Sequence, residues 1–257
     1  MITIDIFSDI VCPFCYLGKQ RLQHVIDQLD LADEVQITMR SFELDQQAHD
    51  YDGTPIEALL AKKYSIPLEQ ARSINRSIAD QGAQLGLHYD FAAMKHTNTL
   101  RAHQLAHYAA EHGLGNALME ALFQAYFSEG LLISDPAVLV DVAVKVGLDR
   151  AGAQAAIADD APYVAAVRQD EAVAAQLGIT SVPTFIFNNR FAVSGAQPEE
   201  VFYAAFAQLR GENSEVAAGS SSQSPSSQDD SAGGDVAADA EGDFTDGCCA
   251  ADGCCRQ

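Results

Sequence analysis

The alternation of apolar and polar residues predicts two strands near the amino terminus, with a helix between them. Apolar side chains alternate with polar ones over residues 2–6, before Phe7, which is the two-residue period of a strand. Pro13 stands where a helix can begin, and apolar residues then follow at helical spacing to about Asp30. The two-residue period returns over 35–42. The chain therefore opens as strand, helix, strand.

A long helical pattern follows, divided by turn signals. It begins at Thr54-Pro55, a capping residue followed by a first-turn proline, and continues to about Gln176. Glycines and a Ser-Asp-Pro sequence between the apolar stripes mark the turns. We expect helices at 55–64, 67–85, 98–112, 115–129, 135–146, 150–158 and 161–177.

The strand pattern resumes after the helices. An apolar run at 184–187, a turn at 188–190 and a second run at 191–194 predict a hairpin. Pro198 then opens a last helix that ends near Arg210. The order βαβ, helices, ββα predicts the α/β class, with one mixed sheet interrupted by a large all-helical insertion.

The composition changes beyond Gly211 to Ser, Gly, Ala, Asp and Gln. Such a segment buries too little apolar surface to offset its chain entropy, so we expect a disordered acidic linker. A cysteine-rich end follows the linker. The expected parts are 1–52 with 178–210 as one discontinuous domain, 53–177 as a helical insertion domain, 211–247 as the linker and 248–257 as the tail.

The charge of the chain limits its partners. It has 257 residues, 36 acidic and 15 basic, and a formal charge of −21 at pH 7. This charge repels phosphate backbones and anionic headgroups, so we expect neither a nucleic-acid nor a membrane partner. The first residues lack the basic and apolar regions of a secretory signal, and no apolar run is long enough to span a membrane. We expect a soluble cytoplasmic protein.

The six cysteines lie in two groups at opposite ends of the chain. Cys12-Pro-Phe-Cys15 follows a predicted strand and opens a helix, which makes this C-x-x-C far more specific than the bare motif. At a helix N-cap the Cys12 sulfur would face backbone N–H groups and the positive end of the helix dipole, which favour a thiolate nucleophile. Cys15, one turn on, can resolve a mixed disulfide. Half of a zinc site and two inert core cysteines are the alternatives.

Val182-Pro183 stands directly before a predicted strand. A cis bond at this place would leave the preceding backbone, at Val182, open to an extended peptide. A trans proline at a strand start is the ordinary alternative, and the dipeptide alone favours it.

Several segments together resemble the FrnE-type branch of the DsbA-like thiol-disulfide oxidoreductases. The similarity runs in one order from residue 2 to about 209. The segments are Cys12-Pro-Phe-Cys15-Tyr-Leu-Gly18-Lys19, Arg40-Ser-Phe-Glu-Leu44, Asn98-Thr-Leu-Arg-Ala-His103, Ala125-Tyr-Phe-Ser-Glu-Gly130, Ile133-Ser-Asp-Pro136, Val182-Pro-Thr-Phe185 and Phe191-Ala-Val-Ser-Gly-Ala-Gln-Pro198.

The resemblance implies a thioredoxin-like fold with Cys12 as attacking thiol, Cys15 as resolving thiol and Pro183 as a cis-proline facing them. Phe14 and Val182 would then contact substrate. The same family includes hydroxychromene-carboxylate isomerases and kappa-class glutathione transferases, which carry serine in place of the first cysteine. The presence of both cysteines favours redox chemistry.

Two further groups of residues can be interpreted either as binding residues or as structural ones. By resemblance to relatives that bind glutathione, Asn98 and Arg101 would line the cleft beside the active site, whereas Asn98 can equally cap its own helix. His103 and His107 have a spacing that can hold a metal, but the helix is amphipathic without one. We expect no metal in the folded body.

The tail cysteines are Cys248, Cys249, Cys254 and Cys255. The resemblance implies a tail dithiol that exchanges with the active-site pair as a redox relay. Four thiolates in eight residues also suit Zn²⁺ or Cu(I), so the metal alternative stays open.

The sequence thus predicts an enzyme, a protein-disulfide oxidoreductase or isomerase that reduces, oxidises or isomerises disulfides. Its partners would be thiol or disulfide substrate proteins or glutathione. We expect no cofactor besides the redox-active disulfide, with glutathione as a co-substrate and with Zn or Cu at the tail under the metal alternative. Reduction or isomerisation fits a glutathione-buffered cytosol better than net oxidation. The alternatives are metal binding or sensing through the tail, and a holdase chaperone that uses the helical cleft. The sequence leaves open whether the protein is a monomer or a homodimer.

Overall fold

The computed structural model describes residues 1–211, and a mixed four-stranded sheet lies at its centre. The strands are β1 (Ile2–Ser8), β2 (Val35–Ser41), β3 (Thr184–Phe187) and β4 (Phe191–Ser194), in the order β2-β1-β3-β4. β1 pairs with β2 in parallel, with Ile2 opposite Val35, whereas β3 is antiparallel to both β1 and β4. The strands predicted from the two-residue period are confirmed.

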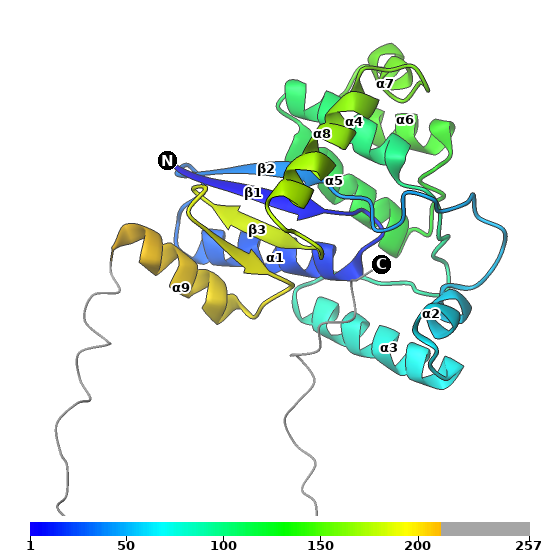
Figure 1. Ribbon diagram of the computed structural model, residues 1–257, viewed down its shortest axis with the longest axis horizontal. Coiled ribbons are helices and arrows are strands. Elements are labelled where there is room, and N and C mark those ends of the chain that lie inside the picture. The colour runs from blue at the N-terminus through cyan, green and yellow to red at the C-terminus, as the bar shows by residue number, and fades with distance from the viewer. Residues whose placement is uncertain (212–257) are drawn as a thin grey trace, which may run out of the picture.

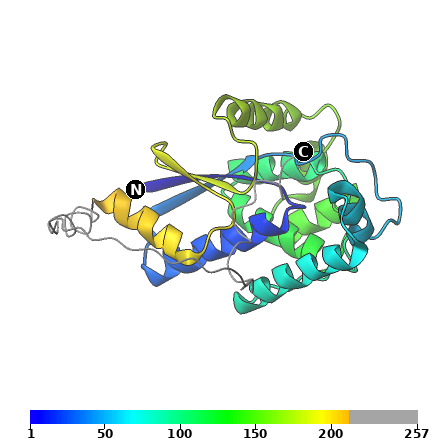
Figure 2. The same ribbon diagram turned by 60° about the horizontal axis from the view of Figure 1, so that its bottom comes forward.

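Helices occupy the segments where the sequence places them. α1 (Pro13–Gln28) makes the crossover that parallel pairing of β1 and β2 requires. The inserted segment holds α2 (Ile56–Tyr64), α3 (Leu68–Gln84), α4 (Leu100–Glu111), α5 (Gly115–Phe123), η1 (Gln124–Ser128), α6 (Pro136–Lys145), α7 (Arg150–Ala156) and α8 (Tyr163–Gln176), and α9 (Glu199–Arg210) closes the described chain. Figures 1 and 2 show α1 and α9 together on one face of the sheet, while α4, α5 and α8 contact β2, and α6 and α7 pack against α4.

Two apolar clusters hold these layers together. One lies between the sheet and the pair α1 and α9, where Ile4 and Ile6 of β1 meet Phe202 and Phe206 of α9. The larger cluster joins the ends of β1 and α1 to the inserted helices. This second core contains residues of β1 and α1 as well as residues of the inserted helices. The insertion therefore buries the N-terminal end of α1. The division into domains stays a prediction.

One predicted helix differs from the structure. The pattern over 115–129 predicts a single α-helix, but the chain changes from α5 to the π-helical turn η1 at Gln124. The wider turn changes the direction of successive side chains, and three aromatic residues, Phe123, Tyr126 and Phe127, are all buried. None of the described helices meets the length and hydropathy needed to cross a membrane.

Candidate active site

The two cysteines of the C-x-x-C open helix α1. Cys12 is the N-cap, with an extended backbone, and Pro13 is the first helical residue. The Cys12 carbonyl accepts the N–H of Cys15 at 3.0 Å, while the Cys12 N–H donates to the carbonyl of Asp9 at 3.2 Å. Both cysteines are 1% exposed, and no disulfide joins them to each other in the described part of the chain. The predicted placement of the motif on a helix N-terminus is confirmed.

The loop before β3 lies against Cys12. The Val182–Pro183 peptide bond is cis, as the resemblance implies. The Sγ of Cys12 lies 3.7 Å from the carbonyl oxygen of Val182, a residue 170 positions away in sequence. Gly18 packs on the same loop, because a Cβ added there would come within 3.2 Å of Cγ of Pro183. The site is thus formed by α1 and a distant loop.

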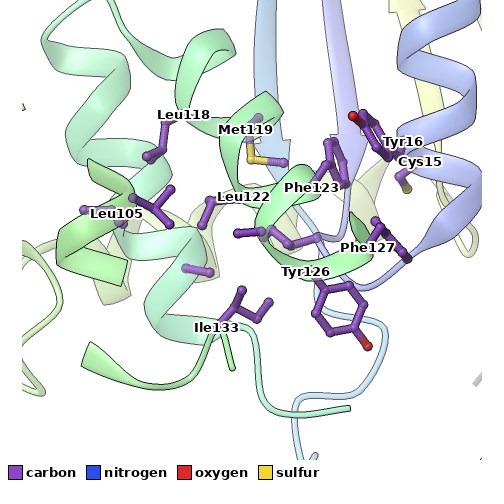
Figure 3. Packing of buried hydrophobic residues seen from close by; sticks show 14 of the residues in the cluster. Cys15, Tyr16, Leu105, Leu118, Met119, Leu122, Phe123, Tyr126, Phe127 and Ile133 are labelled. Carbon is purple, nitrogen blue, oxygen red and sulfur yellow. The ribbon is translucent and has the colours of Figure 1, made fainter. Parts of the chain in front are cut away.

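Aromatic side chains from the insertion cover the buried side of the motif (Figure 3). Tyr16, next to Cys15, stacks on Phe123 with ring centroids 4.9 Å apart and on Phe127 at 6.0 Å. Tyr89 packs edge-on against Phe127, and its hydroxyl donates to the carbonyl of Pro13 at 2.9 Å. Phe14 is half-buried against the same cluster. The insertion therefore builds one wall of the site.

Glu120 of α5 links the insertion to α1 through an ion pair and a hydrogen bond. Its Oε2 lies 2.9 Å from Nζ of Lys19, and its Oε1 accepts the hydroxyl of Tyr16 at 2.9 Å. Burial and the Glu120 carboxylate both raise the pKa of Tyr16 far above its ordinary value, so Tyr16 stays a neutral donor. The hydrogen bond to Glu120 holds the Tyr16 ring in place next to Cys15.

A buried polar group behind the motif was missed by the sequence analysis. It consists of three buried side chains, Asp9 in the turn before Cys12, His103 on α4 and Glu43 after β2, and the partly exposed Arg168 of α8 pairs with Glu43. The signal available in the sequence was an acid at the end of an apolar strand, three residues before a cysteine. The four residues are distant in sequence, so nothing local associates them.

Asn98 and Arg101, expected beside the active site, have partners of their own. The Oδ1 of Asn98 accepts the N–H of Leu100 at 2.9 Å, in the first turn of α4. Arg101 pairs with Asp159 at 2.9 Å and lines a pocket of about 550 Å³, together with residues of α6 and α7. None of the four residues of the C-x-x-C lines that pocket. Contact of either residue with substrate stays a prediction.

The two histidines of α4, His103 and His107, and the C-cap residue His112 have different partners. His103 faces Asp9, His107 lies 3.2 Å from Asp170, and His112 contacts the carbonyl of Tyr108. Over residues 1–211, no group of three or more His, Cys, Asp or Glu side chains is arranged to hold a metal. The tail predictions at Cys248, Cys249, Cys254 and Cys255, and the linker 211–247 apart from Gly211, lie outside the described residues.

Two thiols at a helix N-terminus, beside a cis-proline loop and on a sheet of this order, define the class of protein. It is a thiol-disulfide oxidoreductase built on a thioredoxin fold with an inserted helical segment. The chain belongs to the DSBA-like thioredoxin domain family, whose sequence pattern matches residues 3–207.

Known relatives agree with this membership. The chain is 30% identical over 201 residues to a protein of Bacillus subtilis named "Uncharacterized protein YwbO", covering 77% of this chain and 92% of that protein. The crystal structure of a "probable DsbA oxidoreductase" from Streptomyces coelicolor is 38% identical, with a TM-score of 0.78 over 84% of this chain and 93% of that one. A cytosolic disulfide reductase, DsbM from Pseudomonas aeruginosa, crystallised with glutathione, shares the fold at 19% identity, with a TM-score of 0.54 over 81% and 99% of the two chains.

Proposed function

We propose that this protein is a cytoplasmic disulfide reductase or isomerase of the FrnE-type branch, with Cys12 as nucleophile and Cys15 as resolving thiol. The observation that carries the proposal is the position of Cys12. It occupies the N-cap position of α1 without a side-chain capping hydrogen bond, and its Sγ lies 3.7 Å from the Val182 carbonyl, in the loop with which an extended substrate backbone would pair. Cys15 sits one turn deeper, under the aromatic wall.

The reaction balances as two thiol-disulfide exchanges. The Cys12 thiolate attacks one sulfur of a substrate disulfide, the substrate S–S bond breaks and one substrate thiolate leaves. The Cys15 thiolate then attacks the Cys12 sulfur, and the second substrate thiolate leaves. The substrate gains two electrons, and the enzyme is left with a Cys12–Cys15 disulfide. Two molecules of glutathione return it to the dithiol and become glutathione disulfide.

Glutathione is the reductant that the fold likeness suggests, because DsbM is named as a cytosolic disulfide reductase and was crystallised with it. The substrate class is a disulfide in an extended or unfolded protein segment, since the backbone of the cis-proline loop at Val182 lies beside Cys12. In the reducing cytosol such an enzyme would act by reduction or by reshuffling.

Replacing each cysteine in turn tests the proposal. Cys12→Ser should reduce insulin-disulfide reduction to the uncatalysed rate, because no thiolate remains to attack. Cys15→Ser is the matched variant, and it should accumulate a mixed disulfide at Cys12 that mass spectrometry locates in the tryptic peptide Met1–Lys19. Full activity in Cys12→Ser would refute the assignment. Suppression of aggregation that survives Cys12→Ser would instead support the holdase alternative.

We propose that the thiols of the tail, 248–257, exchange with the Cys12–Cys15 pair as a redox relay. Metal binding by the same thiols is the alternative. Metal analysis of the full chain beside a chain without 248–257 separates them. Zinc or copper bound near one equivalent, and lost with the deletion, supports the metal site. Slower reduction of the Cys12–Cys15 disulfide by glutathione in the deleted chain, with no metal in either chain, supports the relay.

A further inference from the structure

Asp9 connects the Cys12 turn to two other segments. Its main-chain carbonyl accepts the N–H of Cys12 at 3.2 Å, and its Oδ2 accepts the N–H of Leu44 at 2.8 Å. Its Oδ1 makes no hydrogen bond to any residue that the structure describes, although the side chain is 1% exposed. The turn that carries the attacking cysteine is therefore fixed by a buried carboxylate.

His103 is the group that faces the remaining oxygen. It lies on α4 with its side chain 2% exposed, and its Nε2 is 3.4 Å from Oδ1 of Asp9. Within residues 1–211 this nitrogen also has no hydrogen bond. Two buried polar atoms without other partners are costly unless they satisfy each other. A proton shared between Nε2 of His103 and Oδ1 of Asp9 would satisfy both atoms.

The charges around the pair show that Asp9 has no other counter-ion among the described residues. Glu43 is fully buried nearby, and burial raises its pKa, while the hydrogen bond from Arg168 and the charges of His103 and Arg168 oppose the rise. Arg168 also pairs with Glu171, so its charge is shared between two acids. The other titratable groups that sense Asp9 are Tyr126 and His96, and burial opposes the charging of each. His103 therefore interacts with two acids, Asp9 and Glu43, and is the basic side chain that lies against Oδ1 of Asp9.

We propose that His103 is a positioning residue for Cys12, which acts through Asp9 by neutralising the carboxylate that fixes the Cys12 turn. The inference rests on the proposed function, because it concerns the same thiol. An unneutralised carboxylate three residues from Cys12 would repel the thiolate through the poorly screened interior. His103 removes that repulsion while Asp9 keeps its hydrogen bond to Leu44. The reactivity of the thiol thus depends on a side chain supplied by the helical insertion.

The pH dependence of Cys12 alkylation tests this role without requiring turnover. Iodoacetamide is applied to the reduced full chain at a series of pH values, and fragmentation of the peptide Met1–Lys19 separates Cys12 from Cys15. We expect His103→Gln to slow alkylation of Cys12 about tenfold at pH 7 and to move the midpoint of the profile upward, because the charge of Asp9 is no longer cancelled.

His107→Gln is the matched control on the same helix. His107 lies one turn on, against Asp170 and Ser41 rather than Asp9. We expect its alkylation profile to follow that of the unmodified protein within about twofold. An equal change in both variants would show general damage to α4 and would overturn the proposal.

A double variant separates charge from structure. Asp9→Asn keeps an amide oxygen for the Leu44 N–H but removes the charge, so adding it to His103→Gln should restore the wild-type midpoint. A double variant no faster than His103→Gln would overturn the proposal, as would a His103→Gln profile within twofold of wild type. If His103→Gln does not fold, recovery of both folding and the normal profile in the double variant supports the same role, and a double variant that stays unfolded contradicts it. An active Cys12→Ser enzyme would refute the function instead, so the two failures are distinguishable.

Discussion

Gly18 shows, at the scale of one residue, how closely helix α1 approaches the loop of Pro183. A Cβ at this position would lie 3.1 Å from Cζ of Phe185 and 3.2 Å from Cγ of Pro183. Overpacking of this kind costs about 1–3 kcal/mol, more than the roughly 1 kcal/mol by which alanine favours a helix over glycine. The absence of a side chain at Gly18 therefore allows the loop to reach the cysteines.

We expect Gly18→Ala to lower the free energy of unfolding by about 1 kcal/mol and to slow insulin reduction at least about threefold, since the loop would move away from Cys12. Urea titration and the initial rate measure the two effects. Gly115→Ala is the control, because its Cβ would be equally close to Ala110, on the neighbouring helix α4. It should lower stability and leave the rate per folded molecule unchanged. An unchanged rate in Gly18→Ala would contradict the role of the contact.

At the scale of helices and strands, Asp170 connects α8 with β2 and α4. From α8 its Oδ2 accepts the N–H of Ser41 on β2 at 2.9 Å and lies 3.2 Å from Nε2 of His107 on α4, while Oδ1 accepts from Arg40 at 3.2 Å. Burial acts to raise the pKa of Asp170, but the hydrogen bonds and charges of these partners outweigh it and lower the pKa. The ionised carboxylate thus anchors the insertion to the sheet.

Asp170→Asn should lower the free energy of unfolding by about 2 kcal/mol at pH 7. A carboxyl whose folded pKa is lowered stabilises the protein above its unfolded pKa of about 3.9, and this contribution is lost as the pH falls through the folded value. The difference between variant and wild type should therefore shrink as the pH falls below about 4. Urea midpoints from pH 7 to pH 3 measure it.

Asp159→Asn serves as the comparison for that series. Asp159 also pairs with an arginine, but its side chain is 89% exposed, so solvent and salt screen the pair. We expect its urea midpoints to follow those of wild type at every pH. A difference for Asp170→Asn that stays constant down to pH 3 would mean that the charge of Asp170 does not stabilise the fold.

The charge of the whole molecule acts on substrates before contact. A net charge of −21 attracts cationic disulfides and repels anionic ones over a distance set by salt, about 30 Å at 10 mM and about 10 Å at 100 mM. We expect cystamine to react faster than dithiodiglycolate at 10 mM salt, and their ratio of kcat/KM to fall severalfold at 100 mM. The neutral 2-hydroxyethyl disulfide controls for effects of salt on the thiols. A ratio independent of salt would exclude steering.

The elements of the fold were largely predictable because their signals are local. Cys12-Pro13, shortly after a strand, marks the start of α1, and Asn188-Asn189 marks the hairpin, where both residues adopt positive φ. The change to a π-helix at Gln124 was not predictable, since the apolar pattern there suits an ordinary helix equally well. Packing of Phe123, Tyr126 and Phe127 in one core accompanies the wider turn.

By itself the sequence determined the order of strands and helices, the place of the C-x-x-C at a helix N-terminus and the acidity of the chain. Only the tertiary structure decided which groups surround the thiols: the Val182 carbonyl beside Cys12, the aromatic wall over Cys15, and His103 against Asp9. The physical reason is the separation in sequence between the residues that interact. Periodicity and capping report interactions among residues a few positions apart, whereas these contacts join segments up to 170 residues apart, and they exist only once the insertion packs against the sheet.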